Sequence, residues 1–173
     1  LGEGAKAVLD LCTGSGAVAL AIGSEGSRFT VLGTDICDHA LAVAQENQKA
    51  LALSNVSFMR SDLFDSVQGS YDAIVTNPPY ISKDALNSLM PDVRKYEPRL
   101  ALDGGHTGLD FYERIVSTAH LFLNTGGSLM MEIGHDQTAD LQQIIRRNPL
   151  LEMKDCYRDL AGCDRVIHAI KVS

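Results

Sequence analysis

Short apolar runs alternate with amphipathic stretches along most of the chain. The runs are rich in β-branched residues and end near glycine, asparagine, aspartate or proline, which is typical of strands. The stretches between them place apolar residues on one face at helical spacing. Strands are predicted at Ala7–Cys12, Thr30–Ile36, Val56–Asp62, Tyr71–Thr76, Ser128–Ile133, Leu151–Arg158 and Arg165–Val172. Helices are predicted at Ala17–Ser24, His39–Leu51, Leu109–Leu123 and Asp136–Arg147.

This alternation predicts an α/β fold. Strands that alternate with helices form βαβ units, and such units build a mostly parallel sheet with helices on its faces. The two strands that follow each other at the C-terminal end of the chain have no helix between them. They therefore predict an antiparallel pair at one edge of the sheet.

The connections carry further predictions. Asp38 is placed to cap the helix that follows it, and Gly126-Gly127 predicts a turn before the strand Ser128–Ile133. The segment Ile81–Gly108 has no clear periodicity and reads as an extended loop with one helical turn. A long aperiodic loop inside a compact domain is usually functional. Its mixed charges at residues 92–99 indicate either a solvated loop or a lid over a substrate.

Composition then narrows the class of protein. The 173 residues suit one domain, and the net charge of −7 disfavours a dedicated nucleic-acid binder, which would present a basic face to phosphate. No apolar stretch approaches the about 20 residues of a membrane span. The four cysteines form no CxxC pair and have no histidine at zinc-ligand spacing. They indicate reduced thiols, a cytoplasmic protein and no metal site.

A glycine-rich loop with the sequence DLCTGSG occupies residues 10–16, where the first strand gives way to the first helix. Glycines there let backbone N–H groups approach a ligand at a helix N-terminus. The loop is not a phosphate-binding loop of the Gly-Lys-Ser/Thr type, and it is not a complete G-x-G-x-x-G. Taken alone, it also fits a tight turn that binds nothing.

Two carboxylates end the next two strands. Asp35 can accept hydrogen bonds from both hydroxyls of a ribose, and Asp62 can accept one from an adenine amino group. Each of them also fits a helix cap or a solvated turn. Because the glycine loop and both carboxylates fall at the carboxyl ends of successive strands, they jointly predict an adenosine-containing cofactor.

The turn Asn77-Pro78-Pro79-Tyr80 follows the fourth strand. Its two prolines make the turn stiff and leave carbonyl oxygens available as acceptors. The side-chain oxygen of Asn77 and the carbonyl of Pro78 can grip the two hydrogens of a planar amino group, and Tyr80 offers a flat face for stacking. This arrangement can orient a nitrogen toward a methyl donor and stabilise its developing positive charge.

Together these residues resemble the class I S-adenosylmethionine-dependent methyltransferases. Further segments narrow the resemblance to the HemK/PrmC family, whose members methylate the glutamine of the GGQ motif in peptide chain release factors. These segments are EPRLAL at residues 97–102, GLDFY at 108–112, EIG at 132–134 and DLAGCDRV at 159–166. The resemblance implies a Rossmann-like, seven-stranded sheet in the order 3-2-1-4-5-7-6, with strand seven antiparallel and helices on both faces.

The resemblance also implies a role for each position. The methionine end of S-adenosylmethionine would lie on Asp10, Cys12, Thr13, Gly14, Ser15 and Gly16, the ribose on Asp35 and Ile36, and the adenine between Asp62 and Leu63. Asn77, Pro78, Pro79 and Tyr80 would bind the glutamine amide and carry the catalysis, with Asn77 also facing the cofactor. Cys12 replaces the usual glycine, and Leu63 stands where some relatives place an aromatic residue.

The expected function is therefore methyl transfer from S-adenosylmethionine to a release-factor glutamine, with S-adenosylhomocysteine as product and no metal. The chain at residues 1–173 would be the catalytic domain of a longer protein, because the helical N-terminal domain of the family is not in it. We expect a cytoplasmic monomer without membrane contact. The open alternatives are methylation of adenine or guanine in nucleic acid, methylation of a ribosomal-protein glutamine, and a non-catalytic cofactor-binding module.

Overall fold

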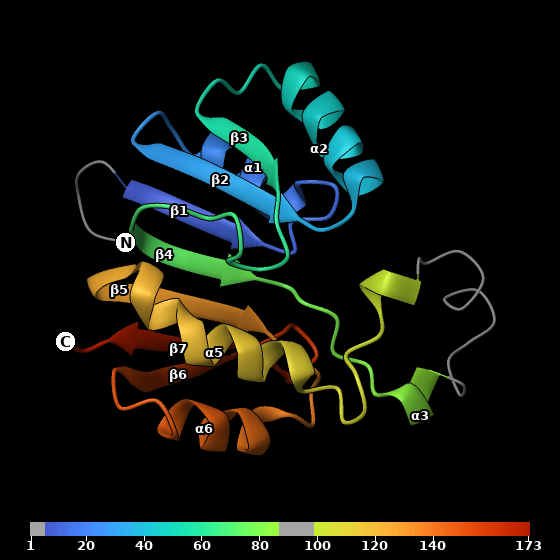
Figure 1. The fold of residues 1–173 in the computed structure, drawn as a ribbon, viewed down its shortest axis with the longest axis vertical. Helices are drawn as coiled ribbons and strands as arrows, with labels where there is room; N and C mark the ends of the chain where they lie inside the picture. The colour runs from blue at the N-terminus through green and yellow to red at the C-terminus, as the bar shows by residue number, and fades with distance from the viewer. Residues whose placement is uncertain (1–5, 87–98) are drawn as a thin grey trace.

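A seven-stranded sheet in the order β3-β2-β1-β4-β5-β7-β6 organises the molecule (Figure 1). The structure is a computed structural model that describes residues 6–86 and 99–173. The strands are β1 (Lys6–Leu11), β2 (Phe29–Asp35), β3 (Val56–Arg60), β4 (Tyr71–Thr76), β5 (Leu123–Glu132), β6 (Leu151–Arg158) and β7 (Asp164–Lys171). The strands β1 to β5 pair in parallel, while β7 runs antiparallel to both β5 and β6. The predicted order and the antiparallel seventh strand are confirmed.

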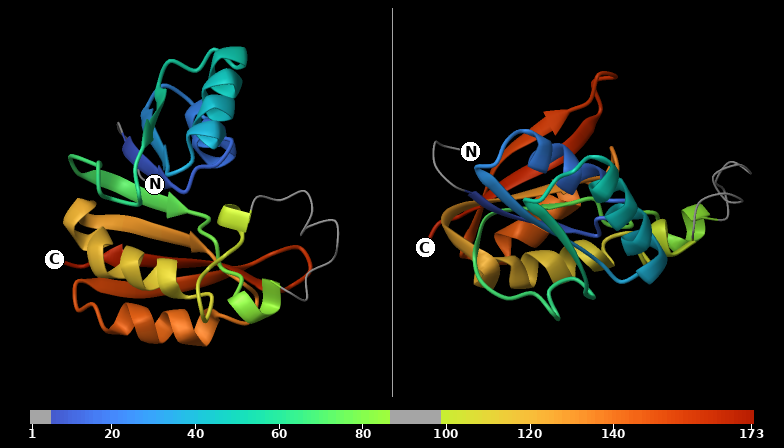
Figure 2. Two further views of the ribbon diagram at one scale, coloured as in Figure 1. Left: turned by 45° about the vertical axis from the view of Figure 1, so that its right-hand side comes forward. Right: turned by 90° about the horizontal axis from the view of Figure 1, so that it is seen from above.

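Helices cover both faces of the sheet, as expected. The helical segments are α1 (Ala17–Ser24), α2 (Asp38–Ala50), α3 (Lys83–Leu86), α5 (Asp110–Phe122), α6 (Thr138–Arg146) and the 3₁₀ turn η1 (Arg99–Ala101). Neighbouring residues of β1 show the two faces, because side chains alternate along a strand. Val8 packs with α1 in one apolar cluster, whereas Leu9 packs with α5 and α6 in the other. Figure 2 shows the helices on the two sides of the sheet.

The start of β5 differs from the prediction. A turn was expected at Gly126-Gly127, but β5 begins at Leu123 and runs through both glycines. The pairing with β4 shifts inside this stretch, from Leu123 opposite Tyr71 to Ser128 opposite Ala73. Gly126 has a φ of 76°, which glycine adopts without strain. The glycines therefore form an irregularity within a strand, and the predicted turn was wrong.

The start of α2 is shifted by one residue. Cys37 is the N-cap, and Asp38 is the first helical residue instead of the cap predicted from the sequence. A carboxylate in the first turn still interacts favourably with the positive end of the helix. Asp38 also lies 3.6 Å from the guanidinium of Arg60, which follows from the neighbouring ends of β2 and β3.

The segment after the Asn77–Tyr80 turn contains little regular structure. It forms α3, the short turn η1 and a single bridge between Ile81 and Asp103. Most of the charged run at residues 92–99 lies outside the described residues. No helix among the described residues has both the length and the apolar character needed to cross a membrane.

Candidate functional site

The strands β1, β2 and β4 end at one edge of the sheet, on the right in Figure 1. A pocket of about 150 Å³ lies at this edge. Its lining consists of Cys12, Gly14, Asp35, Ile36, Cys37, Ala40, Asn77, Pro79, Leu100, Ala101 and Phe111. Crevices at the carboxyl ends of strands are where open α/β sheets bind ligands. A larger hollow of about 500 Å³ lies between α5 and α6 and contains none of the predicted site residues.

The glycine-rich loop bends through three left-handed residues. The φ angles are 56° at Cys12, 56° at Gly14 and 82° at Gly16. Cys12 therefore adopts a conformation that glycine would adopt without strain, in agreement with its place in a glycine-rich motif. Burial raises the pKa of the Cys12 thiol to about 12, so the thiol stays protonated and forms an uncharged wall of the pocket.

Asp10 holds the loop from beneath. One of its carboxylate oxygens accepts hydrogen bonds from the Thr13 hydroxyl at 2.6 Å and from the Ala19 N–H at 3.1 Å. The side chain is 1% exposed. Burial raises the pKa of Asp10 to about 6, against the opposing effect of both hydrogen bonds. Asp10 and Thr13 are thus absent from the pocket lining and act by fixing the loop and the start of α1.

The raised pKa of Asp10 predicts a specific pH dependence of stability. The folded chain keeps a proton on Asp10 up to about pH 6, whereas the unfolded chain releases it near pH 3.8. Rising pH through this window should lower the free energy of unfolding by up to about 3 kcal/mol, with the loss complete above pH 6. Urea unfolding of the wild type and of Asp10→Asn at several pH values measures the difference. Parallel pH curves for the two proteins would contradict the assignment.

Gly14 and Gly16 offer a matched pair for testing the loop. A Cβ added to Gly14 meets no atom within 4 Å, whereas one added to Gly16 lies 2.7 Å from Cζ of Phe58. Both positions have positive φ, so alanine at either should cost about 1 kcal/mol of unfolding free energy. Gly16→Ala should cost about 1–3 kcal/mol more, because the Phe58 ring must move. Equal losses in urea unfolding would show that the contact with Phe58 is unimportant.

Asp35 joins the glycine loop to the start of α2. Its Oδ2 accepts a hydrogen bond from the Gly14 N–H and its Oδ1 one from the Cys37 N–H, both at 2.9 Å. A carboxylate has about four lone-pair sites, so each oxygen can accept a further hydrogen bond. The side chain lines the pocket beside Ile36. The carboxylate is therefore held in place and still able to bind the paired hydroxyls of a ribose.

The loop after β3 lies outside the pocket lining. The Oδ1 of Asp62 accepts a hydrogen bond from Arg114 of α5 at 2.8 Å. The side chain of Leu63 is buried in the apolar core, and its φ is 48°. Adenine contacts at Asp62 and Leu63 stay predictions.

The turn Asn77–Tyr80 places an amide side chain, that of Asn77, and a proline, Pro79, at the pocket wall. Asn77 is exposed at the pocket wall, and its amide has no hydrogen-bond partner among the described residues. Pro78 and Pro79 are buried, and Pro79 also lines the pocket. The amide of Asn77 is consequently available to a ligand, on a turn whose backbone is fixed by two prolines.

Gln137 holds the exit of this turn. Its Nε2 donates to the carbonyls of Tyr80 at 3.1 Å and Gly108 at 3.2 Å, and its Oε1 accepts from the Gly134 N–H at 2.9 Å. The residue is 9% exposed. It therefore connects the start of α6 and the end of β5 to the turn. An isolated glutamine carries no sequence signal, so this contact was not predicted.

We expect Gln137→Met to loosen the turn. The substitution removes the hydrogen bonds to the half-buried carbonyl of Tyr80 and the buried carbonyl of Gly108, which should lower the free energy of unfolding by about 1–3 kcal/mol. Misplacement of Tyr80 should also lower kcat of methyl transfer by about tenfold. Gln143→Met on the exposed face of the same helix is the control. Urea unfolding and steady-state kinetics of both variants test the two effects, and equal behaviour would contradict them.

The structure thus brings together part of the predicted set. The pocket is lined by Cys12, Gly14, Asp35, Ile36, Asn77 and Pro79, and it is not lined by Asp10, Thr13, Ser15, Gly16, Asp62, Leu63, Pro78 and Tyr80. Leu100, Ala101 and Phe111 form a wall without an assigned role; the first two belong to the EPRLAL segment and the third to GLDFY. Within the described part of the chain, no group of three His, Cys, Asp or Glu side chains is placed to hold a metal ion.

A comparison with known families agrees with this geometry. A family model described as the methyltransferase small domain matches residues 2–92, which include the glycine loop, Asp35 and the Asn77–Tyr80 turn. The chain belongs to this family. The predicted membership in the class of methyltransferases is confirmed.

Sequence relatives place the chain within the family. A release factor glutamine methyltransferase from Thermodesulfovibrio yellowstonii is 38% identical over 92% of this chain and 57% of that protein. A ribosomal protein uL3 glutamine methyltransferase from Xanthomonas campestris pv. campestris is 45% identical over 75% of this chain and 42% of that protein. The chain spans about half the length of the curated relatives it matches. These relatives confirm the resemblance to release factor glutamine methyltransferases.

Solved structures confirm the fold. The ribosomal protein L11 methylase from Lactobacillus delbrueckii subsp. bulgaricus superposes with a TM-score of 0.73. The match covers 98% of this chain and 71% of that chain at 20% identity. The Rossmann-like architecture of class I methyltransferases is therefore shared by this family member.

Proposed function

We propose that this chain transfers a methyl group from S-adenosylmethionine to a glutamine side-chain amide in a protein. We further propose that the glutamine is that of the GGQ motif in peptide chain release factors. One observation carries the proposal: Asn77 and Pro79 line the same pocket as Cys12, Gly14 and Asp35. A planar amide held at the turn would lie directly beside a donor held by the loop, as methyl transfer requires.

The residues of the pocket fit S-adenosylmethionine. Asp35 retains acceptor capacity for two ribose hydroxyls, and the space beside Gly14 is open for a ligand. Ile36, Leu100 and Phe111 give the pocket apolar walls. The pocket volume of about 150 Å³ is below the roughly 300–1,000 Å³ of sites that enclose a small molecule. The donor would therefore extend beyond the rim.

The protein would contribute position and electrostatics. When bound, the donor supplies an activated methyl group on a positively charged sulfur, which leaves as the neutral thioether S-adenosylhomocysteine. The amide oxygen of Asn77 and the carbonyl of Pro78 would accept the two N–H groups of the glutamine, and Tyr80 would stack on its plane. As the nitrogen gains the methyl group, these acceptors stabilise its positive charge until one proton passes to water. No metal or strong base is needed.

The names of the relatives support release factors as substrates. The relative named for uL3 supports a second candidate, a glutamine of a ribosomal protein. The acidic composition of the chain argues against adenine or guanine in nucleic acid. We also propose that the protein is a cytoplasmic monomer and the catalytic part of a longer chain.

One assay separates these candidates. The chain is incubated with methyl-labelled S-adenosylmethionine and, in separate reactions, release factor, its GGQ→GGA variant, protein uL3, DNA and RNA. We expect label in the release factor and none in the GGA variant. Label in uL3 alone would favour the second candidate, and label in DNA or RNA would overturn protein glutamine as the acceptor.

A further inference from the structure

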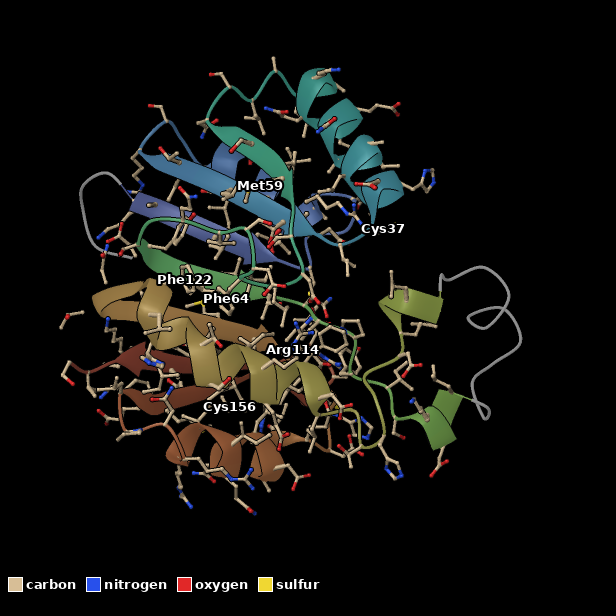
Figure 3. The ribbon with its side chains drawn as sticks, in the orientation of Figure 1. Cys37, Met59, Phe64, Arg114, Phe122 and Cys156 are labelled. Atoms are coloured by element: carbon tan, nitrogen blue, oxygen red, sulfur yellow. The ribbon has the colours of Figure 1, made fainter. Side chains whose placement is uncertain are left out.

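The loop after β3 is clamped to helix α5 at two points. The Nη2 of Arg114 lies 2.8 Å from Oδ1 of Asp62. The Phe64 ring stacks on that of Phe122, with centroids 4.8 Å apart and an interplanar angle of 14°. Figure 3 shows Phe64 and Phe122 side by side, with Arg114 further along the same helix. The place of Asp62 is therefore set by α5 as well as by the strand that precedes it.

The same face of α5 reaches the pocket. Phe111 lines the pocket, and Arg114 follows three residues later, on the same side of the helix. On the sheet side, the N–H of Ser61 donates to the backbone carbonyl of Asp35 at 3.0 Å, so Asp62 directly follows a residue that is hydrogen-bonded to Asp35. Phe111 lines the pocket, whereas Arg114 lines a neighbouring hollow together with Leu63 and Phe64, so α5 connects the pocket to the loop that carries Asp62. A donor that extends beyond the rim on this side would bring its base to Asp62.

We infer that Arg114 is a positioning residue for the 6-amino group of the donor's adenine; this inference rests on the proposed function. The ion pair occupies Oδ1 of Asp62 and leaves Oδ2 to accept a hydrogen bond from the exocyclic N–H. A 6-oxo purine has an acceptor at this position and would meet the carboxylate unfavourably. Arg114 thereby strengthens the preference for a 6-aminopurine that the Asp62 carboxylate gives the site.

The ion pair between Arg114 and Asp62 contributes little to the stability of the fold. The side chains of Arg114 and Asp62 are 49% and 39% exposed, and pairs this exposed contribute little to folding. Arg147 forms a comparable exposed pair with Glu113 of the same helix, at 3.4 Å. Arg147→Ala therefore removes an arginine–carboxylate pair from α5 without touching the loop after β3, and serves as the matched control.

Isothermal titration with S-adenosylhomocysteine and S-inosylhomocysteine tests the inference. The wild type should prefer the 6-amino ligand. Arg114→Ala should weaken the binding of S-adenosylhomocysteine by about five- to tenfold, which is the effect of one loosened charge-assisted hydrogen bond. It should leave the affinity for the 6-oxo ligand unchanged. Arg147→Ala should change neither affinity. In an Asp62→Ala background the preference should be lost, and adding Arg114→Ala should have no further effect.

Other results would overturn the inference. If Arg114→Ala weakened the binding of both ligands equally, Arg114 would have a merely structural role. If it changed neither affinity, Arg114 would have no role in binding. If the wild type bound both ligands equally, Asp62 would not recognise the 6-amino group, and S-adenosylmethionine could still be the donor. A wild type that binds neither ligand would instead contradict S-adenosylmethionine as the donor, and with it the proposed function.

Discussion

Asn77→Ala is expected to reduce kcat of methyl transfer by roughly 10³-fold and to leave the Kd of S-adenosylhomocysteine within about threefold of the wild type. The amide of Asn77 is exposed at the pocket wall and has no partner among the described residues, so its removal leaves no buried group unsatisfied. The loss therefore falls on the acceptor and not on folding. Single-turnover methylation at saturating donor, with titration of the product, measures both quantities.

Two variants sharpen this result. Asn77→Asp keeps an acceptor oxygen and should retain more activity than Asn77→Ala. Asn124→Ala removes an exposed asparagine at the opposite edge of the sheet, where it bonds to Asp72, and should leave kcat unchanged. Wild-type turnover by Asn77→Ala would remove the turn from the catalytic machinery.

Asp35→Ala is expected to weaken the binding of S-adenosylhomocysteine by about 100-fold. The substitution deletes the acceptors proposed for two ribose hydroxyls, each a charge-assisted hydrogen bond. It also releases the Gly14 and Cys37 N–H groups, so the glycine loop loses its connection to α2. At saturating donor, kcat should stay within a few-fold of the wild type, because the acceptor turn is untouched. Calorimetric titration and donor-saturation kinetics give the two numbers.

Asp38→Ala provides the matched control for this prediction. Asp38 lies three residues further along the chain, and its side chain is 75% exposed in a 3.6 Å pair with Arg60. Its removal changes the net charge as Asp35→Ala does, but it touches neither the pocket nor the loop. Similar affinities for the two variants would mean that Asp35 acts through charge alone and does not bind the ribose.

The order of elements could be predicted from the sequence, because hydrophobic periodicity and turn residues are local signals. Errors occurred where tertiary pairing decided the outcome. Gly126-Gly127 has the composition of a turn, yet the neighbouring strand β4 draws it into β5 as an irregularity. The misplaced start of α2 is a smaller, local error: the helix begins one residue earlier than predicted, at Asp38, and the N–H of Cys37 bonds to the nearby Asp35.

The site could be predicted where a residue has a recognisable motif and a fixed place at a strand end. Asp35 and Asn77 meet both conditions, and both line the pocket. Gln137 and Arg114 meet neither, because their roles depend on contacts between elements distant in sequence. Contact between Asp10 and the ligand stays a prediction; the sequence does not show that its carboxylate bonds to Thr13 and Ala19, because that arrangement depends on the bend of the loop.

The hydrogen bonds from Gly14 and Cys37 to Asp35 have a further, kinetic consequence. They order the carboxylate proposed to bind the ribose, together with the glycine loop, when the chain folds and before any donor arrives. Little conformational entropy then remains to be lost at these groups on association, and encounter of the donor with this part of the site requires no rearrangement.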